Sequence, residues 1–263
     1  MTAFIPSSMT PFLQTLEARS QLTQAERQII LDLPFAPQHV RANQDFVQKG
    51  ESVTNSCFIL EGFVGTFGQN RRGERQITSV FLTGEMIDLN TVVVPEAIAS
   101  IQALTPTTIL RVPHAALRAA AGGHPGISEA FWRECVIAAT LFSEWVVNVG
   151  RRDARSRLAH LFCEIACRSG HKNADDSFRF PFPITQAQLA DMVGLTPVHV
   201  NRTLSGLRED GIVEISLKTA HIMNWNRLAQ IGEFDPSYLR LDSAGRRRQH
   251  PAMAGPPPTQ SLQ

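Results

Sequence analysis

The spacing of hydrophobic and polar positions changes character twice along the chain. Near the N-terminus, Phe12, Leu13 and Leu16 precede a Thr23-x-x-Glu26 capping box, which predicts one or two short helices within residues 12–32. Between about 36 and 113, β-prone runs alternate with Gly, Asn and Pro turns; these runs are residues 57–60, 63–67, 76–81, 91–94 and 108–112. Several short strands at this spacing favour an antiparallel β-roll, and we assign residues 12–122 to it.

A long helix is predicted for residues 123–150. His124-Pro125-Gly126 marks its start, and no helix breaker follows until about Gly150. Apolar residues recur along it in steps of three and four: Ile127, Phe131, Cys135, Ala138, Phe142, Trp145 and Val149. Since Val136, Ile137 and Ala139 add a second apolar side, the helix needs two surfaces to pack against. We expect the β-roll on one side and the same helix of a second subunit on the other, the alternative being a helix buried inside a monomer.

The rest of the chain predicts a smaller domain at residues 151–235. The basic stretch from Gly150 to Arg157 indicates a hinge, residues 158–166 an amphipathic helix, residues 170–177 a polar loop and residues 178–182 a short strand. Residues 241–263 are rich in Arg, Pro, Gln and Gly, and we expect this tail to be disordered. The expected fold class is therefore α+β: an N-terminal antiparallel β-roll, a long dimerisation helix and a smaller C-terminal domain of helices and short strands.

Residues 184–208 show the pattern of two short helices joined by a tight turn. Thr185 and Gln188 form a capping box, and Gly194 supplies the left-handed conformation that the turn requires. Thr196 is a second N-cap, followed by Pro197 at the first helical position. These features together predict a helix-turn-helix motif.

The second of these helices separates into an apolar and a polar face. Val200, Leu204 and Leu207 are expected to point inward, and Val198, Asn201, Arg202 and Ser205 outward. Because Arg pairs with guanine and Asn with adenine in the major groove, we interpret the outward row as base-contacting. The phosphate contacts are expected from Thr185, Gln186, Thr196, His199 and Lys218. The alternative is an ordinary helical hairpin with a solvated polar face.

A β-hairpin is predicted after the motif, since the apolar runs Gly211–Ile215 and His221–Met223 flank Ser-Leu-Lys-Thr-Ala. This hairpin would form the wing of a winged helix-turn-helix domain. Lys218 at its tip would contact phosphate, although a solvated lysine explains the residue equally well.

Composition and charge narrow the function classes. No apolar run reaches the length of a membrane span, and the N-terminus lacks the pattern of a signal peptide, so we expect a cytoplasmic protein without membrane contacts. Residues 1–150 carry ten basic against thirteen acidic residues, whereas residues 151–240 carry twelve against ten, which is compatible with a DNA-binding C-terminal half. Cys163 and Cys167 share one helix face; we interpret them as packing residues, with a redox switch as the alternative.

The order of roll, long helix, basic hinge and winged helix-turn-helix resembles the Crp/Fnr family of bacterial transcription regulators over residues 12–225. The motifs that carry the resemblance are Asp45-x-Val-x-x-Gly50-Glu51, Phe58-x-Leu-x-Gly62, Gly84-Glu-Met-Ile-Asp88, His160-Leu-Phe-Cys-Glu164 and Leu195–Leu204. The resemblance implies a homodimer that binds a palindromic operator in double-stranded DNA and contacts RNA polymerase.

Departures from the family pattern concern the effector. The cyclic-nucleotide-binding members have a Gly-Glu pair and an Arg-Ser pair where this chain has Asp88-Leu89 and about Ala97-Ile98, and Phe142-Ser143 replaces their adenine-contacting Thr-Ser. We therefore expect no cyclic AMP binding, because Asp88 would repel the phosphate. No cysteine precedes Cys57, which argues against the iron–sulfur cluster of the oxygen-sensing branch. Val198 stands where family members often have Glu, so we expect an altered half-site.

Two alternative functions remain at this level. A cupin-like metalloenzyme would need clustered ligands, but His39 and His114 are far apart in sequence and no catalytic motif is present; we expect no enzyme activity, metal or cofactor. A constitutive DNA-binding regulator would use its β-roll only as a scaffold. The residues around Phe81–Asp88 would decide between a filled roll and an effector pocket, and an effector would act by reorienting the long helix and a hinge at Gly150.

Overall fold

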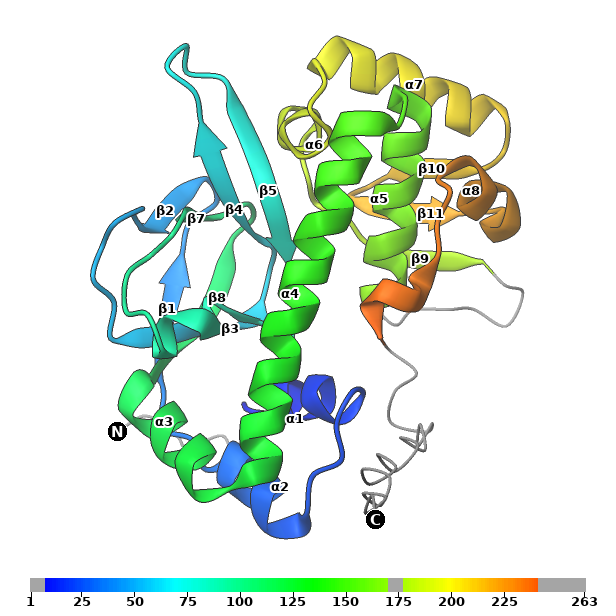
Figure 1. Cartoon of the computed structure of the whole chain (residues 1–263). Helices are drawn as coiled ribbons and strands as arrows, with labels where there is room; N and C mark the ends of the chain where they lie inside the picture. Colours follow the sequence, from blue (N-terminus) through cyan, green and yellow to red (C-terminus); the bar gives the residue numbers. More distant parts are fainter. Residues whose placement is uncertain (1–7, 170–176, 241–263) are drawn as a thin grey trace, which may run out of the picture.

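A β-roll and a smaller helical domain flank one long helix in the computed structural model, which describes residues 8–169 and 177–240 (Figure 1). The expected disordered tail at 241–263 lies outside the described residues, and so does the expected polar loop at 170–177 except for Ser177. The two predicted N-terminal helices are α1 (Thr10–Glu17) and α2 (Gln24–Leu31). The capping box starts α2, because Thr23 and Glu26 accept each other's backbone N–H. No helix within these ranges is both long enough and apolar enough to span a bilayer.

The roll consists of two antiparallel sheets of four strands, with the orders β1-β8-β3-β6 and β2-β7-β4-β5. Its strands are β1 (Ala36–Val40), β2 (Gln44–Val47), β3 (Asn55–Glu61), β4 (Val64–Gln69), β5 (Arg75–Phe81), β6 (Met86–Ile87), β7 (Ser100–Ala103) and β8 (Thr107–Pro113). Inward-facing small and branched side chains fill the space between the sheets, among them Val47, Ile59, Val64, Ile101 and Ile109. The predicted roll is therefore present.

One strand prediction was wrong. The run at residues 91–94 is not a strand; it overlaps the 3-10 helix η1 (Leu89–Val92) and the turn that follows. Asp88 enters this helix in the left-handed conformation, with a φ of 55°, and Thr91 Oγ1 donates a hydrogen bond to the Asp88 carbonyl at 2.7 Å. Local hydrogen bonding to the backbone thus outweighs the β-propensity of three consecutive valines.

The predicted long helix is α4 (Pro125–Arg151), preceded by the short helix α3 (His114–Gly123). Helix α4 crosses the whole molecule between the roll and the smaller domain (Figure 1). It continues through Gly150, and the chain turns at Arg152 and Asp153, where Arg152 is extended. The turn between α4 and α5 therefore lies within the stretch from Gly150 to Arg157 in which a hinge is expected.

The expected apolar stripe of α4 requires a correction. Ile127 and Phe131 pack in a core with α1, α3 and the roll, and Trp145 packs against α5, so these three residues are buried within the chain. Ala138 and Phe142 are exposed and Val149 is partly exposed. A different apolar row lies on the surface, consisting of Trp132, Val136, Ala139, Phe142, Val146 and Val147. The sequence predicted two apolar sides correctly but assigned the residues to them incorrectly.

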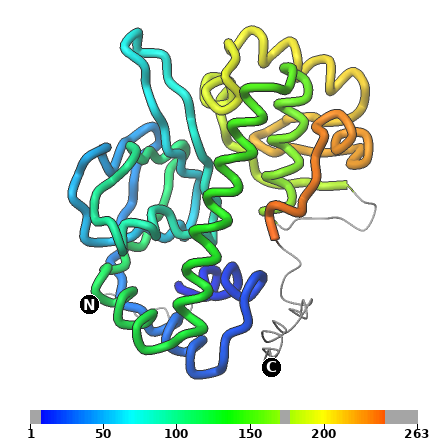
Figure 2. The backbone as a smooth tube through the Cα atoms, viewed as in Figure 1, coloured from blue at the N-terminus to red at the C-terminus, as the bar shows by residue number. Residues whose placement is uncertain are grey.

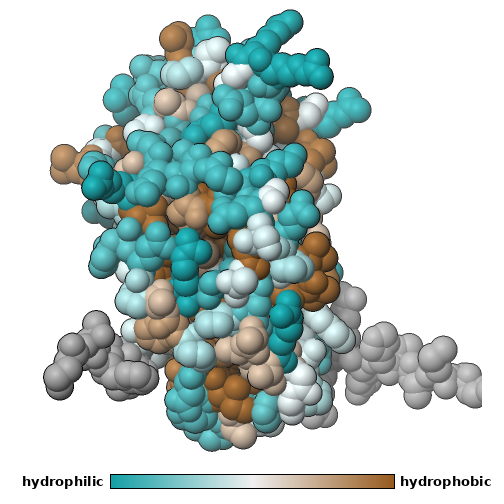
Figure 3. All heavy atoms as spheres, turned by 90° about the vertical axis from the view of Figure 1, so that its left-hand side faces the viewer, coloured by the Kyte–Doolittle hydropathy of each residue, from teal (hydrophilic) through white to brown (hydrophobic). Residues whose placement is uncertain are grey.

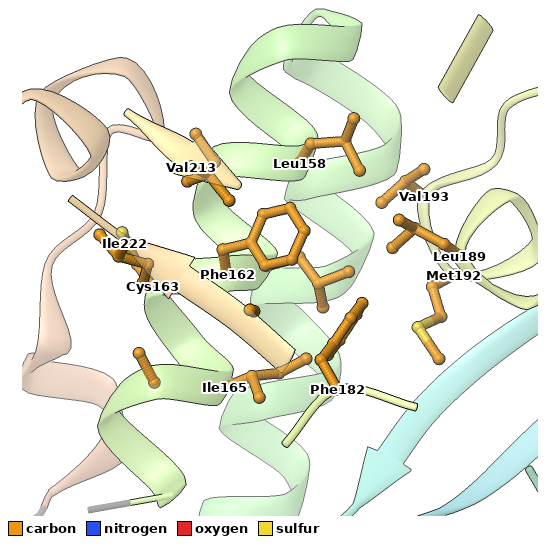
Figure 4. Packing of buried hydrophobic residues seen from close by; sticks show 14 of the residues in the cluster. Leu158, Phe162, Cys163, Ile165, Phe182, Leu189, Met192, Val193, Val213 and Ile222 are labelled. Atoms are coloured by element: carbon orange, nitrogen blue, oxygen red, sulfur yellow. The ribbon is translucent and has the colours of Figure 1, made fainter. Parts of the chain in front are cut away.

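The smaller domain is a winged helix-turn-helix. Its elements are α5 (Ala154–Ser169), β9 (Phe178–Pro181), α6 (Gln186–Val193), α7 (Pro197–Glu209), β10 (Val213–Ser216), β11 (Thr219–Ile222), α8 (Trp225–Ile231) and the 3-10 helix η2 (Pro236–Leu239). Phe162 of α5 lies at the centre of its core, between the sheet and α6 (Figure 4). The chain folds beyond the expected boundary at 235, because Leu239 packs on Ile137 and Leu141 of α4.

Candidate nucleic-acid interface

Helix α6 begins and ends as the sequence predicts. Thr185 Oγ1 accepts the Gln188 N–H at 3.2 Å, and Gln188 Oε1 accepts the Thr185 N–H at 2.9 Å. Gly194 ends the helix with a φ of 64°, which a residue with a Cβ adopts at a cost. Two residues later Thr196 caps α7 by accepting the His199 N–H. This local chemistry fixes the angle between the two helices.

Helix α7 presents the predicted polar row to solvent. Val200 and Leu207 are fully buried, and Leu204, also expected to point inward, is partly buried and packs against the same core. Val198 is 80% exposed, Asn201 and Arg202 are exposed, and Ser205 is partly exposed. The four side chains expected to contact bases are therefore accessible, and the helix is anchored by the opposite side.

Two hollows flank this row. One, of about 180 Å³, lies between α6, α7 and β10 and includes Asn201, Ser205 and Gln186 in its lining. The other, of about 420 Å³, lies between α7 and the start of α5 and includes His199, Arg202 and Arg155. Sequence reasoning recognised the basic stretch that contains Arg155 but did not name it as a site residue. Its ion pair with Asp210 fixes it beside α7.

The expected phosphate contacts lie around the same surface. Thr185, Gln186 and Thr196 are exposed and His199 is partly exposed, and the hydroxyls of both threonines also serve as helix caps. Lys218 is exposed at the tip of the wing, next to a Leu217 side chain that is 98% exposed. The Phe182 N–H donates to the Lys218 carbonyl at 2.7 Å. The wing tip is thus held close to the chain that enters α6.

The β-roll holds the helix-turn-helix directly. Gln188 Nε2 donates to the Leu104 carbonyl at 2.7 Å and to Asn43 Oδ1 at 2.9 Å, although Gln188 also caps α6. Arg75 forms an ion pair with Asp191 at 2.9 Å, and Gln76 Nε2 donates to the Met192 carbonyl at 3.0 Å. Helix α6 is therefore docked on the roll along its length, a contact that sequence analysis did not anticipate.

Asp88, which stands where cyclic-nucleotide-binding members have their Gly-Glu pair, places a buried polar group in the roll. Asp88 Oδ1 accepts the Cys57 N–H at 3.0 Å, while Asp88 Oδ2 is buried without a hydrogen-bond partner in the described part of the chain. Burial raises the pKa of Asp88 to about 7, and the nearby Arg111 opposes this shift. The guanidinium of Arg111 donates its hydrogen bonds to Gln38 Oε1 and to the Phe46 carbonyl, not to Asp88.

The cysteines favour the packing interpretation. Cys163 is buried in the core of the winged domain, and Cys167 is partly buried. Burial raises the pKa of both thiols, to about 11 for Cys167, which disfavours the reactive thiolate. The two histidines considered as metal ligands lie in different surroundings. His39 is exposed and its ring contacts Thr108, whereas His114 is buried and its ring contacts Thr91. Over residues 8–169 and 177–240, no three His, Cys, Asp or Glu side chains are grouped to hold a metal.

Together the roll, the long helix and the exposed α7 define a DNA-binding protein with a cyclic-nucleotide-binding-type domain. The profile of the Crp-like helix-turn-helix domain matches residues 156–231, and that of the cyclic nucleotide-binding domain matches residues 37–123. The chain belongs to the Crp/Fnr family of transcription regulators, and it is a DNA-binding regulator rather than an enzyme.

Named relatives are regulators of the same kind. The nitrogen fixation regulation protein FixK of Azorhizobium caulinodans is 26% identical over 173 residues, which cover 66% of this chain and 69% of that protein. The fumarate and nitrate reduction regulatory protein of Shigella dysenteriae is 20% identical over 192 residues, covering 73% of this chain and 76% of that protein. The structure of FixK2 from Bradyrhizobium japonicum matches 76% of this chain and 98% of its own, with a TM-score of 0.68 and 22% identity.

Proposed function

We propose that the chain binds a palindromic operator as a homodimer, with one α7 in the major groove of each half-site. The observation that carries this proposal is the row of accessible side chains on a helix whose opposite face is buried. Arg202 would pair with guanine and Asn201 with adenine, while Val198 would contact a thymine methyl group. Ser205 would complete the base contacts.

Phosphate contacts would surround this row. We assign them to Thr185, Gln186, Thr196, His199 and Lys218, all of which are at least partly accessible on the elements around α7. These contacts would give affinity without sequence preference. The base-contacting row would then determine which operator is bound.

The dimer interface would be the exposed apolar row of α4. Trp132 is 69% exposed and Phe142 is 51% exposed, and Val136, Ala139 and Val146 lie at helical spacing between and beyond them. Such a row along one helix is typical of a seam between two copies. A two-fold dimer would place two α7 helices on one duplex, which accounts for a palindromic site.

We further propose that cyclic AMP is not the effector. The Asp88 carboxyl group is buried inside the roll. The positive charge of Arg111 lowers the pKa of Asp88, but the Arg111 guanidinium donates its hydrogen bond to Gln38. Phe142 lies on the exposed side of α4, where it would be buried in the dimer interface. DNA binding also leads us to propose contact with RNA polymerase and action in the cytoplasm.

A second candidate is a constitutive regulator whose roll serves as a scaffold. The apolar core between the two sheets of the roll favours it. Footprinting of genomic DNA with purified protein, with and without a small-molecule extract of cells, separates the two. A footprint that depends on the extract would support an effector, and an identical footprint would support the scaffold.

The base-reading role is tested by Arg202→Ala. We expect a loss of about 1–3 kcal/mol in binding free energy on the selected operator and little change on random DNA. Arg227→Ala on α8, where the guanidinium contacts Gln230, is the matched control and should leave both affinities unchanged. An equal loss on operator and random DNA would reassign Arg202 to phosphate contact.

A further inference from the structure

The hairpin between β4 and β5 projects beyond the rest of the roll (Figure 2). The part of β5 next to the turn is docked on the end of α6, through the Arg75–Asp191 ion pair and the hydrogen bond from Gln76 to the Met192 carbonyl. Gln76 Oε1 also lies 3.2 Å from the Cβ position of Gly194, the residue of the turn between α6 and α7. The hairpin is therefore fixed against the turn that leads into α7.

The tip extends past that contact, toward the side from which DNA would approach. Arg71 and Arg72 lie in the turn of residues 70–74, directly beyond the Gln69–Arg75 pair that ends the β4–β5 ladder. Figure 1 shows the tip at the same end of the molecule as α7. Figure 3 shows the face of the molecule that lies on the left in Figure 1, and hydrophilic side chains cover most of its upper part. A partner at this tip would therefore meet a mainly polar surface, which favours a polar partner.

The turn is built to present its two arginines. Asn70 Oδ1 accepts the N–H groups of Arg72 and Glu74, at 2.9 and 3.1 Å, and Asn70 Nδ2 donates to the Glu74 carboxylate at 2.6 Å. Gly73 takes the left-handed conformation that closes the turn. The Glu74 carboxylate at the tip is therefore held by Asn70. Arg71 and Arg72 are exposed, and neither guanidinium has a hydrogen-bond or ion-pair partner within the described ranges.

We propose that Arg71 and Arg72 form a second DNA contact, in which the β-roll binds backbone phosphates beside the N-terminal end of α7. A guanidinium pair on a rigid turn suits phosphate oxygens and carries no base specificity. The contact would add affinity to a half-site that α7 has already selected. It rests on the proposed binding of α7 in the major groove.

The test is the salt dependence of operator binding by the full chain carrying R71Q and R72Q. Each phosphate contact adds about 0.9 to the slope of log affinity against log salt, so removing one such contact should lower the slope by that amount. Between 50 and 200 mM salt, the affinity advantage of the natural protein should shrink about 3.5-fold for each contact. Replacing both arginines with lysine should preserve the slope, because the charges remain. In ethylation interference, the R71Q/R72Q protein should lose the signals at specific phosphates, whereas the double lysine protein should keep them.

Arg118→Gln is the matched control, because it removes a charge from an exposed position on α3, at the opposite end of the molecule (Figure 1). An unchanged slope in the R71Q/R72Q protein, or an equal change in the control, would overturn the inference. Normal DNA binding with loss of transcription by purified polymerase would also overturn it and would assign the tip to the polymerase. If the natural protein binds no duplex, the proposed function fails instead.

Discussion

Arg168 provides the sharpest test of how the winged domain is joined to the β-roll. Its side chain is only 2% exposed and lies between α5 and the roll. The guanidinium donates to Glu85 at 2.6 Å, to Glu164 at 2.8 Å and to the Val80 carbonyl at 2.6 Å. Burial alone would lower the pKa of Arg168, but the carboxylates of Glu85 and Glu164 raise it above its ordinary value. The arginine therefore remains charged and binds both domains.

Replacing Arg168 with Met keeps much of the volume and removes the charge. Glu164 is completely buried and the Glu85 side chain is 16% exposed, and both would lose their cationic partner. Removing one partner of a buried ion pair costs about 3–5 kcal/mol, mainly because the remaining charge stays desolvated. The indole of Trp145 and the hydroxyl of Tyr238 still donate to Glu164, which places the expected loss at the lower end, about 3 kcal/mol.

Urea denaturation at a fixed protein concentration, followed by tryptophan fluorescence and circular dichroism, measures this loss. Arg133→Met is the matched control, because Arg133 pairs with Glu129 on the surface of α4 and should contribute less than about 1 kcal/mol. Adding Glu85→Gln and Glu164→Gln to Arg168→Met should recover part of the stability, since no buried charge is then left unpaired. A loss below about 1 kcal/mol for Arg168→Met would refute the reasoning.

Three other side-chain changes are open to direct test. Burial raises the pKa of Asp88 from 3.8 to about 7, so the folded chain holds a proton that the unfolded chain releases, and stability should fall as pH rises from 4 to 7. Asp88→Asn should remove this fall, which is worth about 2.5–3 kcal/mol between pH 5 and pH 8, in the unfolding free energies measured with urea at those two pH values. Phe142→Glu should shift sedimentation from dimer to monomer and weaken operator binding, whereas Leu217→Glu at the wing tip should leave the dimer intact. Leu217→Asn should raise unfolding free energy by about 0.5–1 kcal/mol, because Leu217 and Lys218 both have positive φ, which Asn tolerates better; an unchanged melting temperature would contradict this.

The candidate site could be predicted from the sequence because its determinants are local. Caps at Thr185 and Thr196, and a glycine at the turn, act within a few residues of where they occur. The faces of α7 then follow from helical periodicity, and Leu204, although only partly buried, packs against the core as predicted. Elements of this kind depend little on distant parts of the chain.

The errors occur where distant residues decide. Strands β1, β2, β6 and β7 were missed because they are short and carry no clear alternation, and their place is set by pairing across the roll. Both sides of α4 are apolar, so periodicity alone could not tell which side the roll covers and which stays exposed. The docking of α6 on β5 joins residues more than a hundred positions apart, and nothing in either segment indicates the other.

That docking changes how a signal in the β-roll would reach the DNA. A hinge after α4 would allow the winged domain to move as a free unit, with α4 as its only mechanical link. Here α6 is also held by Gln188 and by the Arg75–Asp191 pair, and α5 is held by Arg168. Any reorientation of α7 relative to the roll must therefore break buried hydrogen bonds and a buried ion pair, which makes a two-state change more favourable than a continuous one. A displacement of β5 by even a small distance would act on the helix-turn-helix directly, without passing through α4.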